Sequence, residues 1–145
     1  METLLVSQEG RVATVTLNRP DVRNAFNDQV VSELTQAFRE MDSSVQVVVL
    51  QGVGKSFCAG ADLNWMKKSA TYTQQQNAED AGDMAGLFDT IDRFPGVVIG
   101  RVHGAALGGG VGLVSCCDIV VAVERAKFGL TEVRLGIVPA VISPF

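Results

Sequence analysis

Residues Gly104–Gly112 read GAALGGGVG and place three consecutive glycines ahead of an apolar segment that can form a helix. Glycine has no Cβ, so a ligand can approach the main chain closely at such a run. If a helix begins at Gly109 or Gly110, its first N–H groups have no intrahelical acceptor and carry the positive end of the helix dipole. This stretch therefore predicts a backbone site for a negatively charged oxygen.

The segments around the glycine run alternate between strand and helix patterns. Strands are expected at 4–6, 11–17 (joined to the first around Gly10), 45–50, 97–102 and 119–123. Helices are expected behind an Asn27 cap to about Asp42-Ser43, over 81–91 ahead of Phe94-Pro95, and from the glycine run to about Cys116, while Thr71–Asn77 is polar and expected to be mobile. This alternation predicts one α/β domain with right-handed crossovers and ligand loops at the carboxyl ends of the strands.

Composition favours a globular chain and excludes some partners. The chain has 145 residues, of which 47% are apolar and 19% charged, a balance typical of a folded domain. A net charge of −4 gives little general attraction for a phosphate backbone, so nucleic acid is not expected as a partner. The first ten residues have no basic region and no long apolar stretch, and so do not form a signal peptide.

The three cysteines predict reduced thiols and not a disulfide or metal framework. Cys58, Cys116 and Cys117 are odd in number, lie in apolar sequence and lack C-x-x-C spacing. Adjacent cysteines do not bridge easily without strain. We therefore expect a reducing, cytoplasmic compartment and no metal.

The segment Gly52–Ser56 follows an expected strand and resembles part of a phosphate-binding loop. The full motif requires glycine at position 49, where the chain has Val49, and the following FCAG does not begin a long helix. The single histidine, His103, lies beside the glycine run, but no Ser or Cys triad can be assembled around it from spacing. A strand-end histidine that satisfies backbone groups is the favoured interpretation.

Residues 104–123 also invite a membrane interpretation. They carry one charged residue, Asp118, and a Gly108/Gly112 pair of the kind found where membrane helices meet. The central charge, the glycine cluster and the absence of basic or aromatic flanks argue against a spanning helix. No membrane association is expected.

Two glycine turns at the ends of neighbouring expected strands carry a family resemblance. They read SFCAGADL at 56–63 and HGAALGGG at 103–110. Together with VTLNRP at 15–20, RNA at 23–25, CDI at 117–119, FG at 128–129 and EVRLG at 132–136, they resemble the enoyl-CoA hydratase/isomerase (crotonase) family over essentially the whole chain. The resemblance implies an α/β crotonase-like fold with a ββα-type spiral core. Because the family's domain continues into further helices, residues 1–145 are expected to be a truncated N-terminal core domain without the C-terminal helical region.

The resemblance implies an oxyanion hole made of two main-chain donors. Matched by position, these are the N–H groups of Ala61 and Gly109, which would bind the thioester carbonyl and stabilise an enolate. Such donors favour the charge that develops in the transition state. The same resemblance implies that the coenzyme A part of the substrate lies near Arg23, Ala25, Ala59, Gly60, Asp62, Leu63 and Gly108, with Arg23 a phosphate partner. An equally good role for Asp62 is the N-cap of a short helix beginning at Leu63.

The acid–base residues depart from the family pattern. Hydratases of the family usually have one glutamate shortly after the triple glycine and another after Phe-Gly; here the first position is Gly112 and the second is Glu132. We expect Glu132 to be the catalytic acid–base residue, the alternative being an exposed carboxylate at a helix start. One carboxylate can serve either hydration or double-bond isomerisation, and both stay open.

The resemblance also implies a substrate and partners. The stretches LNWMKK at 63–68, GVGL at 110–113 and IVPAVISP at 137–144 most resemble the methylglutaconyl-CoA hydratase and isohexenylglutaconyl-CoA hydratase branches, which hydrate branched acidic enoyl thioesters. The partner is then an acyl-CoA thioester, with no metal or redox cofactor, and a full-length member forms a homotrimer or hexamer. A non-catalytic interaction fragment with an exposed apolar edge is the alternative of another class.

Overall fold

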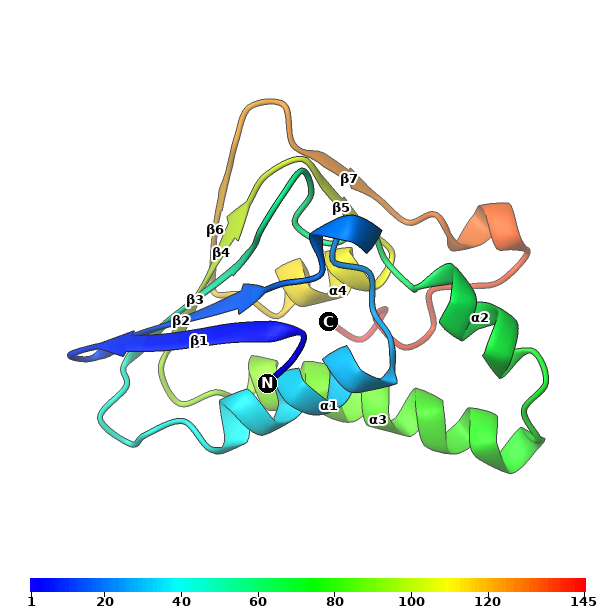
Figure 1. The fold of residues 1–145 in the computed structure, drawn as a ribbon, viewed down its shortest axis with the longest axis horizontal. Coiled ribbons are helices and arrows are strands. Elements are labelled where there is room, and N and C mark those ends of the chain that lie inside the picture. Colours follow the sequence, from blue (N-terminus) through cyan, green and yellow to red (C-terminus); the bar gives the residue numbers. More distant parts are fainter.

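The computed structural model describes all 145 residues as one α/β unit (Figure 1). Its elements in chain order are β1 (Leu4–Glu9), β2 (Val12–Leu17), the 3₁₀ turn η1 (Pro20–Val22), α1 (Asp28–Arg39), β3 (Val47–Gly52), α2 (Leu63–Ser69), α3 (Gln74–Asp92), β4 (Val97–Val102), β5 (Ala105–Leu107), α4 (Gly109–Ser115), β6 (Ile119–Ala122), β7 (Lys127–Gly129) and the 3₁₀ turn η2 (Glu132–Leu135). The expected α/β class is confirmed.

The main sheet has five strands in the order β1-β2-β3-β4-β6. A hairpin with Gly10 at φ +58° joins the antiparallel pair β1 and β2, and the pairs that follow are parallel. Parallel strands need a crossover, here supplied by the helical segments between them. The carboxyl ends of β2, β3 and β4 consequently lie at one edge, from which the loops toward α1, α2 and β5 leave.

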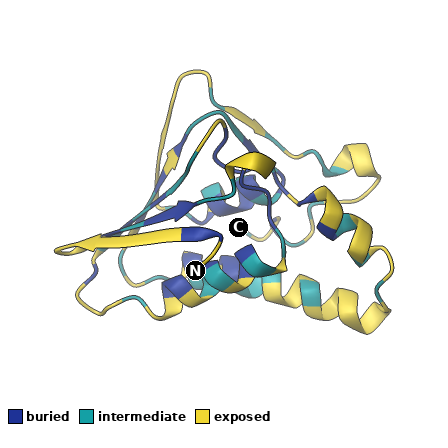
Figure 2. Ribbon diagram, viewed as in Figure 1, coloured by how far each residue is buried: buried dark blue, intermediate teal, exposed yellow.

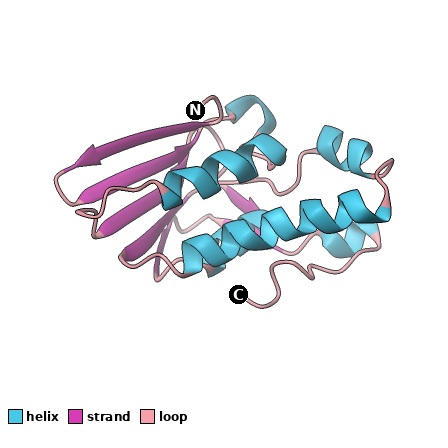
Figure 3. Cartoon of the chain, turned by 90° about the horizontal axis from the view of Figure 1, so that it is seen from below, coloured by secondary structure: helices cyan, strands magenta, loops and turns pink.

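Helices α1 and α3 pack side by side on one face of the sheet (Figures 1 and 3). Asn27 begins α1, because its side-chain oxygen accepts the Val30 N–H at 2.9 Å. The buried side of α1 is the apolar stripe seen in the sequence, including Val30, Leu34 and Phe38. Together with β2, β3 and β4 the two helices enclose one continuous apolar core.

Three expected boundaries are wrong in the structure. Helix α1 ends at Arg39, about one turn before Asp42-Ser43, and β3 is displaced by two residues to Val47–Gly52. The segment 74–77, expected to be mobile, is the first turn of α3. Thr73 and Gln76 form a reciprocal capping box there, which satisfies free N–H groups of a polar first turn.

A second, smaller sheet pairs β5 with β7 in parallel and leads into α4. Cys58 joins it, because its N–H donates to Ala105 O and its carbonyl accepts from the Leu107 N–H. The loop after β3 is thereby held against the strand before the glycine run. The two glycine turns found in the sequence are neighbours in space.

A large part of the apolar surface in the second half of the chain is exposed (Figure 2). All four residues of β6 are exposed, and Val133 and Val138 keep 77% and 75% of their accessible surface. Isolated exposed apolar residues are ordinary, but a contiguous group indicates a surface that another segment or chain covers. None of the helices has the length and hydropathy needed to cross a membrane.

Replacing Gly82 by alanine is expected to raise the free energy of unfolding by about 0.5–1 kcal/mol, because glycine inside a helix carries an entropic cost relative to alanine. Gly82 lies within α3, and a Cβ there would have no atom within 4 Å. Urea denaturation measures the change. Gly96→Ala is the matched control and should destabilise, because its Cβ would lie 2.5 Å from the Gln46 carbonyl oxygen. A Gly82→Ala variant less stable than the parent would contradict this account of α3.

Candidate active site

A cavity of about 460 Å³ opens where α2, α3, the start of α4, η2 and the last residues of the chain meet. Seven of the residues expected to act on a ligand line it, namely Ala59, Gly60, Ala61, Leu63, Gly108, Gly109 and Glu132. The remaining wall is mainly apolar. An apolar cavity with a few convergent polar groups is the usual form of a small-molecule site.

Ala61 presents its N–H without an acceptor anywhere in the chain. The residues on either side of it are held by Phe26, whose N–H donates to Gly60 O and whose carbonyl accepts from the Asp62 N–H, both at 2.7 Å. Gly60 has φ +90°, and a Cβ there would lie 2.9 Å from the Leu107 carbonyl oxygen. Only glycine suits the backbone conformation and the close contact at this position. The turn leaves the Ala61 N–H free to bind a ligand.

Gly109 is the first residue of α4, and its N–H also lacks an acceptor within the chain. This is the position at which a helix leaves its N–H groups unsatisfied. Gly108 precedes it at φ +50° and is held by its own N–H, which donates to Gly129 O at 2.9 Å. The helix start that the sequence indicated is confirmed, and both expected donors border the same cavity.

Glu132 begins η2 and contributes its carboxylate to the cavity wall. It is half-buried, which argues against the exposed helix-start alternative. Oε2 is buried without a hydrogen-bond partner, while Oε1 would lie 2.9 Å from a Cβ placed on Gly108. The carboxylate therefore sits directly beside the residue that precedes the Gly109 donor. Unsatisfied buried polar atoms are rare in folded proteins and are often functional.

Gly112 has no space for a side chain. A Cβ there would lie 2.5 Å from Ile142 Cγ2 and 2.8 Å from Phe88 Cζ. The C-terminal segment thus fills the position at which the resemblance implies a second glutamate. Of these three residues only Ile142 belongs to the cavity wall, and its contribution there is apolar.

The structure confirms the expected role of Asp62 as a helix cap. Its Oδ1 accepts the N–H groups of Asn64 at 2.8 Å and Trp65 at 3.4 Å, and its Oδ2 pairs with Arg19 at 3.1 Å. Burial disfavours the charged form, but the hydrogen bonds from Asn64, Arg19 and Trp65 outweigh it, so the pKa of Asp62 lies below its usual value. Sequence reasoning assigned no role to Arg19, which also donates to Ala25 O at 2.6 Å and so joins both loops.

Replacing Asp62 by asparagine is expected to lower the free energy of unfolding at neutral pH by about 1–3 kcal/mol, because Arg19 loses the partner of a largely buried contact. Asparagine still caps α2, so the helix itself is kept. A lowered folded-state pKa gives stability above the ordinary pKa of about 4 and loses it as pH falls through the folded value. Denaturation curves of the two proteins should therefore converge below about pH 4. A constant difference at all pH values would contradict the ion-pair explanation.

The other residues expected near coenzyme A lie beside the cavity and not in its wall. Arg23 and Ala25 belong to the loop between β2 and α1. Arg23 is exposed at φ +55° and the following Asn24 has φ +57°, an uncommon conformation for residues other than glycine. The Asn24 side chain explains how this loop is held, because it accepts from Arg19 N–H and donates to Val53 O and Ser56 O, each at 2.8 Å. A ligand role for these residues stays a prediction.

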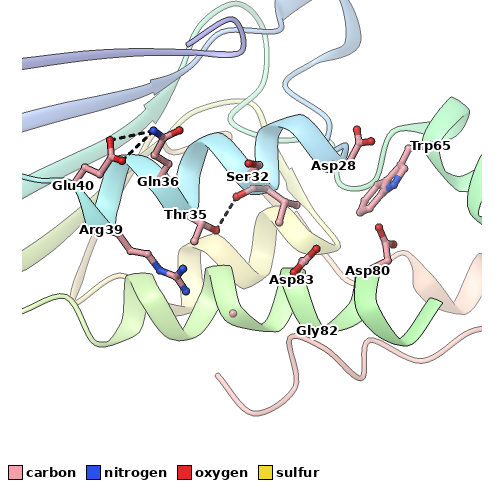
Figure 4. Close-up of a pocket in the computed structure, with 12 residues that line it drawn as sticks. Asp28, Ser32, Thr35, Gln36, Arg39, Glu40, Trp65, Asp80, Gly82 and Asp83 are labelled. Atoms are coloured by element: carbon pink, nitrogen blue, oxygen red, sulfur yellow. Dashed lines mark hydrogen bonds between the residues drawn. The ribbon is translucent and has the colours of Figure 1, made fainter. Parts of the chain in front are cut away.

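A second, larger groove of about 590 Å³ runs between α1 and α3 (Figure 4). Its wall is polar, with Asp28 from α1 and Asp80 and Asp83 from α3 at one end. Burial and, after it, the charges of Asp28 and Asp83 raise the pKa of Asp80. Trp65 and Asp80 line both this groove and the cavity, so the two adjoin at these residues. None of the residues expected at the site lies in the groove, so the smaller cavity is the candidate active site.

Other reactive side chains are occupied or inert. The three cysteines are free, and burial raises the pKa of each thiol to about 12, so none is a ready nucleophile. His103 Nε2 lies 2.9 Å from Gly54 O and so satisfies a backbone group, in agreement with the favoured interpretation. No three His, Cys, Asp or Glu side chains are grouped as metal ligands would be.

Comparisons with known proteins show the family and agree with the fold. The family model for enoyl-CoA hydratase/isomerase matches residues 7–145. A putative enoyl-CoA hydratase of Thermus thermophilus is 37% identical over 94% of this chain and 54% of its own length. The 2,3-dehydroadipyl-CoA hydratase of Escherichia coli is 41% identical over 96% of this chain and 53% of its own length. The chain therefore spans about half the length of the curated relatives it matches.

Solved structures also match this chain over about half of their own length. The enoyl-CoA hydratase of Shewanella pealeana superposes with a TM-score of 0.95 and 45% identity, covering 98% of this chain and 54% of that one. A putative enoyl-CoA hydratase/isomerase (crotonase) of Legionella pneumophila gives a TM-score of 0.94 and 42% identity, covering 98% and 56%.

Proposed function

Because the chain belongs to the enoyl-CoA hydratase/isomerase (crotonase) family and has its fold, we propose that it is the catalytic core of a hydratase that adds water to an α,β-unsaturated acyl-CoA thioester. One observation carries the proposal. Two main-chain N–H groups without acceptors, at Ala61 and Gly109, border the same cavity as a carboxylate oxygen of Glu132 that has no partner. Unpaired donors and an unpaired acceptor around one cavity are what an oxyanion and its proton source require.

In the proposed reaction the thioester carbonyl oxygen accepts hydrogen bonds from Ala61 and Gly109. Water attacks C3 and gives a proton to Glu132, while the C2=C3 electron pair moves toward the thioester oxygen and forms the enolate. Glu132 then returns the proton to C2, so one carboxylate acts as base and then as acid. A pair of donors aimed at the enolate oxygen contributes several kcal/mol of transition-state stabilisation, roughly 3–4 kcal/mol for each donor.

We infer that the acyl chain is branched and acidic, as in methylglutaconyl-CoA. The stretches at 63–68, 110–113 and 137–144 carry this inference; the first and the last contribute residues to the cavity wall, and the second directly follows Gly109, which also lines it. Arg134 is the one cationic side chain that lines the cavity, and it would pair with a carboxylate on the acyl chain. Arg23 and the residues around Ala25 and Ala59 would border the coenzyme A nucleotide. A full-length protein of this kind would form a trimer or hexamer.

A double-bond isomerase is the second candidate, and the packing of Gly112 favours it. With Ile142 and Phe88 in the place of a second carboxylate, a single glutamate would have to hold the water. In a 3-enoyl thioester the same Glu132 can instead take a proton from C2 and deliver it to C4, and in a 2-enoyl thioester such as methylglutaconyl-CoA it can take the proton from C4 and deliver it to C2. This reaction needs no water, and so it does not require a polar group in the cavity wall to hold one.

Turnover of methylglutaconyl-CoA in ¹⁸O-water separates these functions. Label in a 3-hydroxyacyl product supports hydration, and a shifted double bond without label supports isomerisation. 3-Methylcrotonyl-CoA, which keeps the branch and lacks the carboxylate, is the matched substrate, and equal kcat/KM for both would contradict the acidic acyl chain. No turnover and no binding of either thioester would support the non-catalytic fragment.

A further inference from the structure

Phe26 contacts both halves of the proposed oxyanion hole, and nothing in its sequence position indicates this. It lies in the loop between β2 and α1 and keeps 1% of its accessible surface. Its main chain forms an isolated parallel bridge with Ala61. The two hydrogen bonds of that bridge go to Gly60 and Asp62, so the N–H of Ala61 itself is left pointing away from Phe26. The Phe26 backbone therefore sets the direction of the first donor.

The Phe26 ring sets the position of the second donor. A Cβ placed on Gly109 would lie 2.8 Å from Cε2 and 3.0 Å from Cδ2 of this ring. The first turn of α4 therefore rests directly on the ring. The ring also meets Phe88 edge to face, with centroids 6.3 Å apart and planes at 81°. A ring wedged in this way cannot shift without moving α4 or the buried Phe88.

We propose that Phe26 is a positioning residue that fixes the separation of the Ala61 and Gly109 N–H groups. The inference rests on the proposed function, since the two donors matter only if they hold one oxygen. A single rigid residue that joins both donors by its backbone and its ring keeps the hole assembled before substrate arrives. Preorganised donors contribute most to catalysis, because no reorganisation is needed when the charge develops.

The test is Phe26→Leu in the full chain. The backbone bridge to Ala61 stays, while the support beneath Gly109 is lost. We expect kcat to fall about 10- to 100-fold with KM within about three-fold, because a displaced donor affects the transition state more than the ground state. Phe26→Met has about the same volume as Phe26→Leu, but its longer, unbranched side chain can extend toward Gly109 and should recover part of kcat.

Phe38→Leu is the matched control. Phe38 is also buried and packs edge to face on Phe94 with centroids 5.7 Å apart. It lies on α1 outside the cavity wall, whereas Phe26 is part of that wall. Its loss should lower Tm about as much as the loss of Phe26 but leave kcat unchanged. A merely structural role for Phe26 predicts the same kinetics for the two variants, and that result would overturn the inference.

A spectroscopic readout separates this inference from the proposed function. Hexa-2,4-dienoyl-CoA is a conjugated thioester whose absorption moves to longer wavelength when its carbonyl is polarised by hydrogen bonds. We expect the bound probe to show this red shift with the parent chain and with Phe38→Leu, and to lose most of it with Phe26→Leu at similar affinity. A full red shift in Phe26→Leu would overturn the role of Phe26 alone. Absence of binding or of any red shift with the parent chain would overturn the proposed function itself.

Discussion

Replacing Glu132 by glutamine is expected to lower kcat for hydration or isomerisation by about 10²- to 10⁴-fold, the range for loss of a general acid–base group. Glutamine keeps the shape of the side chain beside Gly108 but cannot accept a proton from water or from C2. In the proposed function Ala61 and Gly109 hold the thioester, so its dissociation constant should stay within about three-fold. Steady-state kinetics with methylglutaconyl-CoA and equilibrium binding of its saturated analogue measure the two quantities.

The stability of the same variant distinguishes a catalytic from a structural carboxylate. Glu132 Oε2 is buried without a partner, and such an atom costs stability in the folded protein. Glutamine removes the charge, so Tm should be unchanged or higher even as activity is lost. Glu124→Gln, at an exposed turn between β6 and β7, is the control and should alter neither quantity. A Glu132→Gln protein with full activity, or one that is much less stable, would refute the acid–base role.

The fold could be predicted where local patterns dominate. The β-branched run around Val47–Val49 and the apolar stripe of α1 depend on neighbours a few residues away, and both elements were found. The first turn of α3 was missed, because Gln74–Asn77 has no apolar face and is held by the Thr73 cap. The sequence did contain that signal, since Thr73 and Gln76 have the spacing of a capping box.

The candidate site could likewise be predicted from the sequence only in part. The glycine run indicated the free N–H groups at the start of α4, whereas Ala61 was indicated only by the family resemblance. The roles of Arg19 and Phe26 could not be predicted, because each depends on contacts with segments more than 30 residues distant. Likewise, Gly112 reveals the lack of a glutamate, but only the fold shows that Ile142 occupies the space. Contacts of this kind are tertiary and leave no periodic pattern.

Gly112→Glu, which restores the glutamate at the position that the family pattern indicates, is expected to lower the free energy of unfolding by about 3 kcal/mol or more and to add no hydratase activity. Its Cβ alone would meet Ile142 at 2.5 Å and Phe88 at 2.8 Å, and both side chains are buried. Overpacking a dense core costs about 1–3 kcal/mol, and burying a carboxylate without a partner adds several more.

Gly86→Glu on α3 is the matched control for Gly112→Glu, because the same substitution meets open space there, and its stability should change by less than about 1 kcal/mol. Adding Ile142→Ala to Gly112→Glu removes the closest contact and should recover part of the lost stability. If the double variant also gains hydratase activity, the apolar packing around Gly112 is what separates this cavity from a two-carboxylate site. A stable, more active Gly112→Glu single variant would show instead that Ile142 and Phe88 move aside easily, and it would remove the structural argument for chemistry by one glutamate.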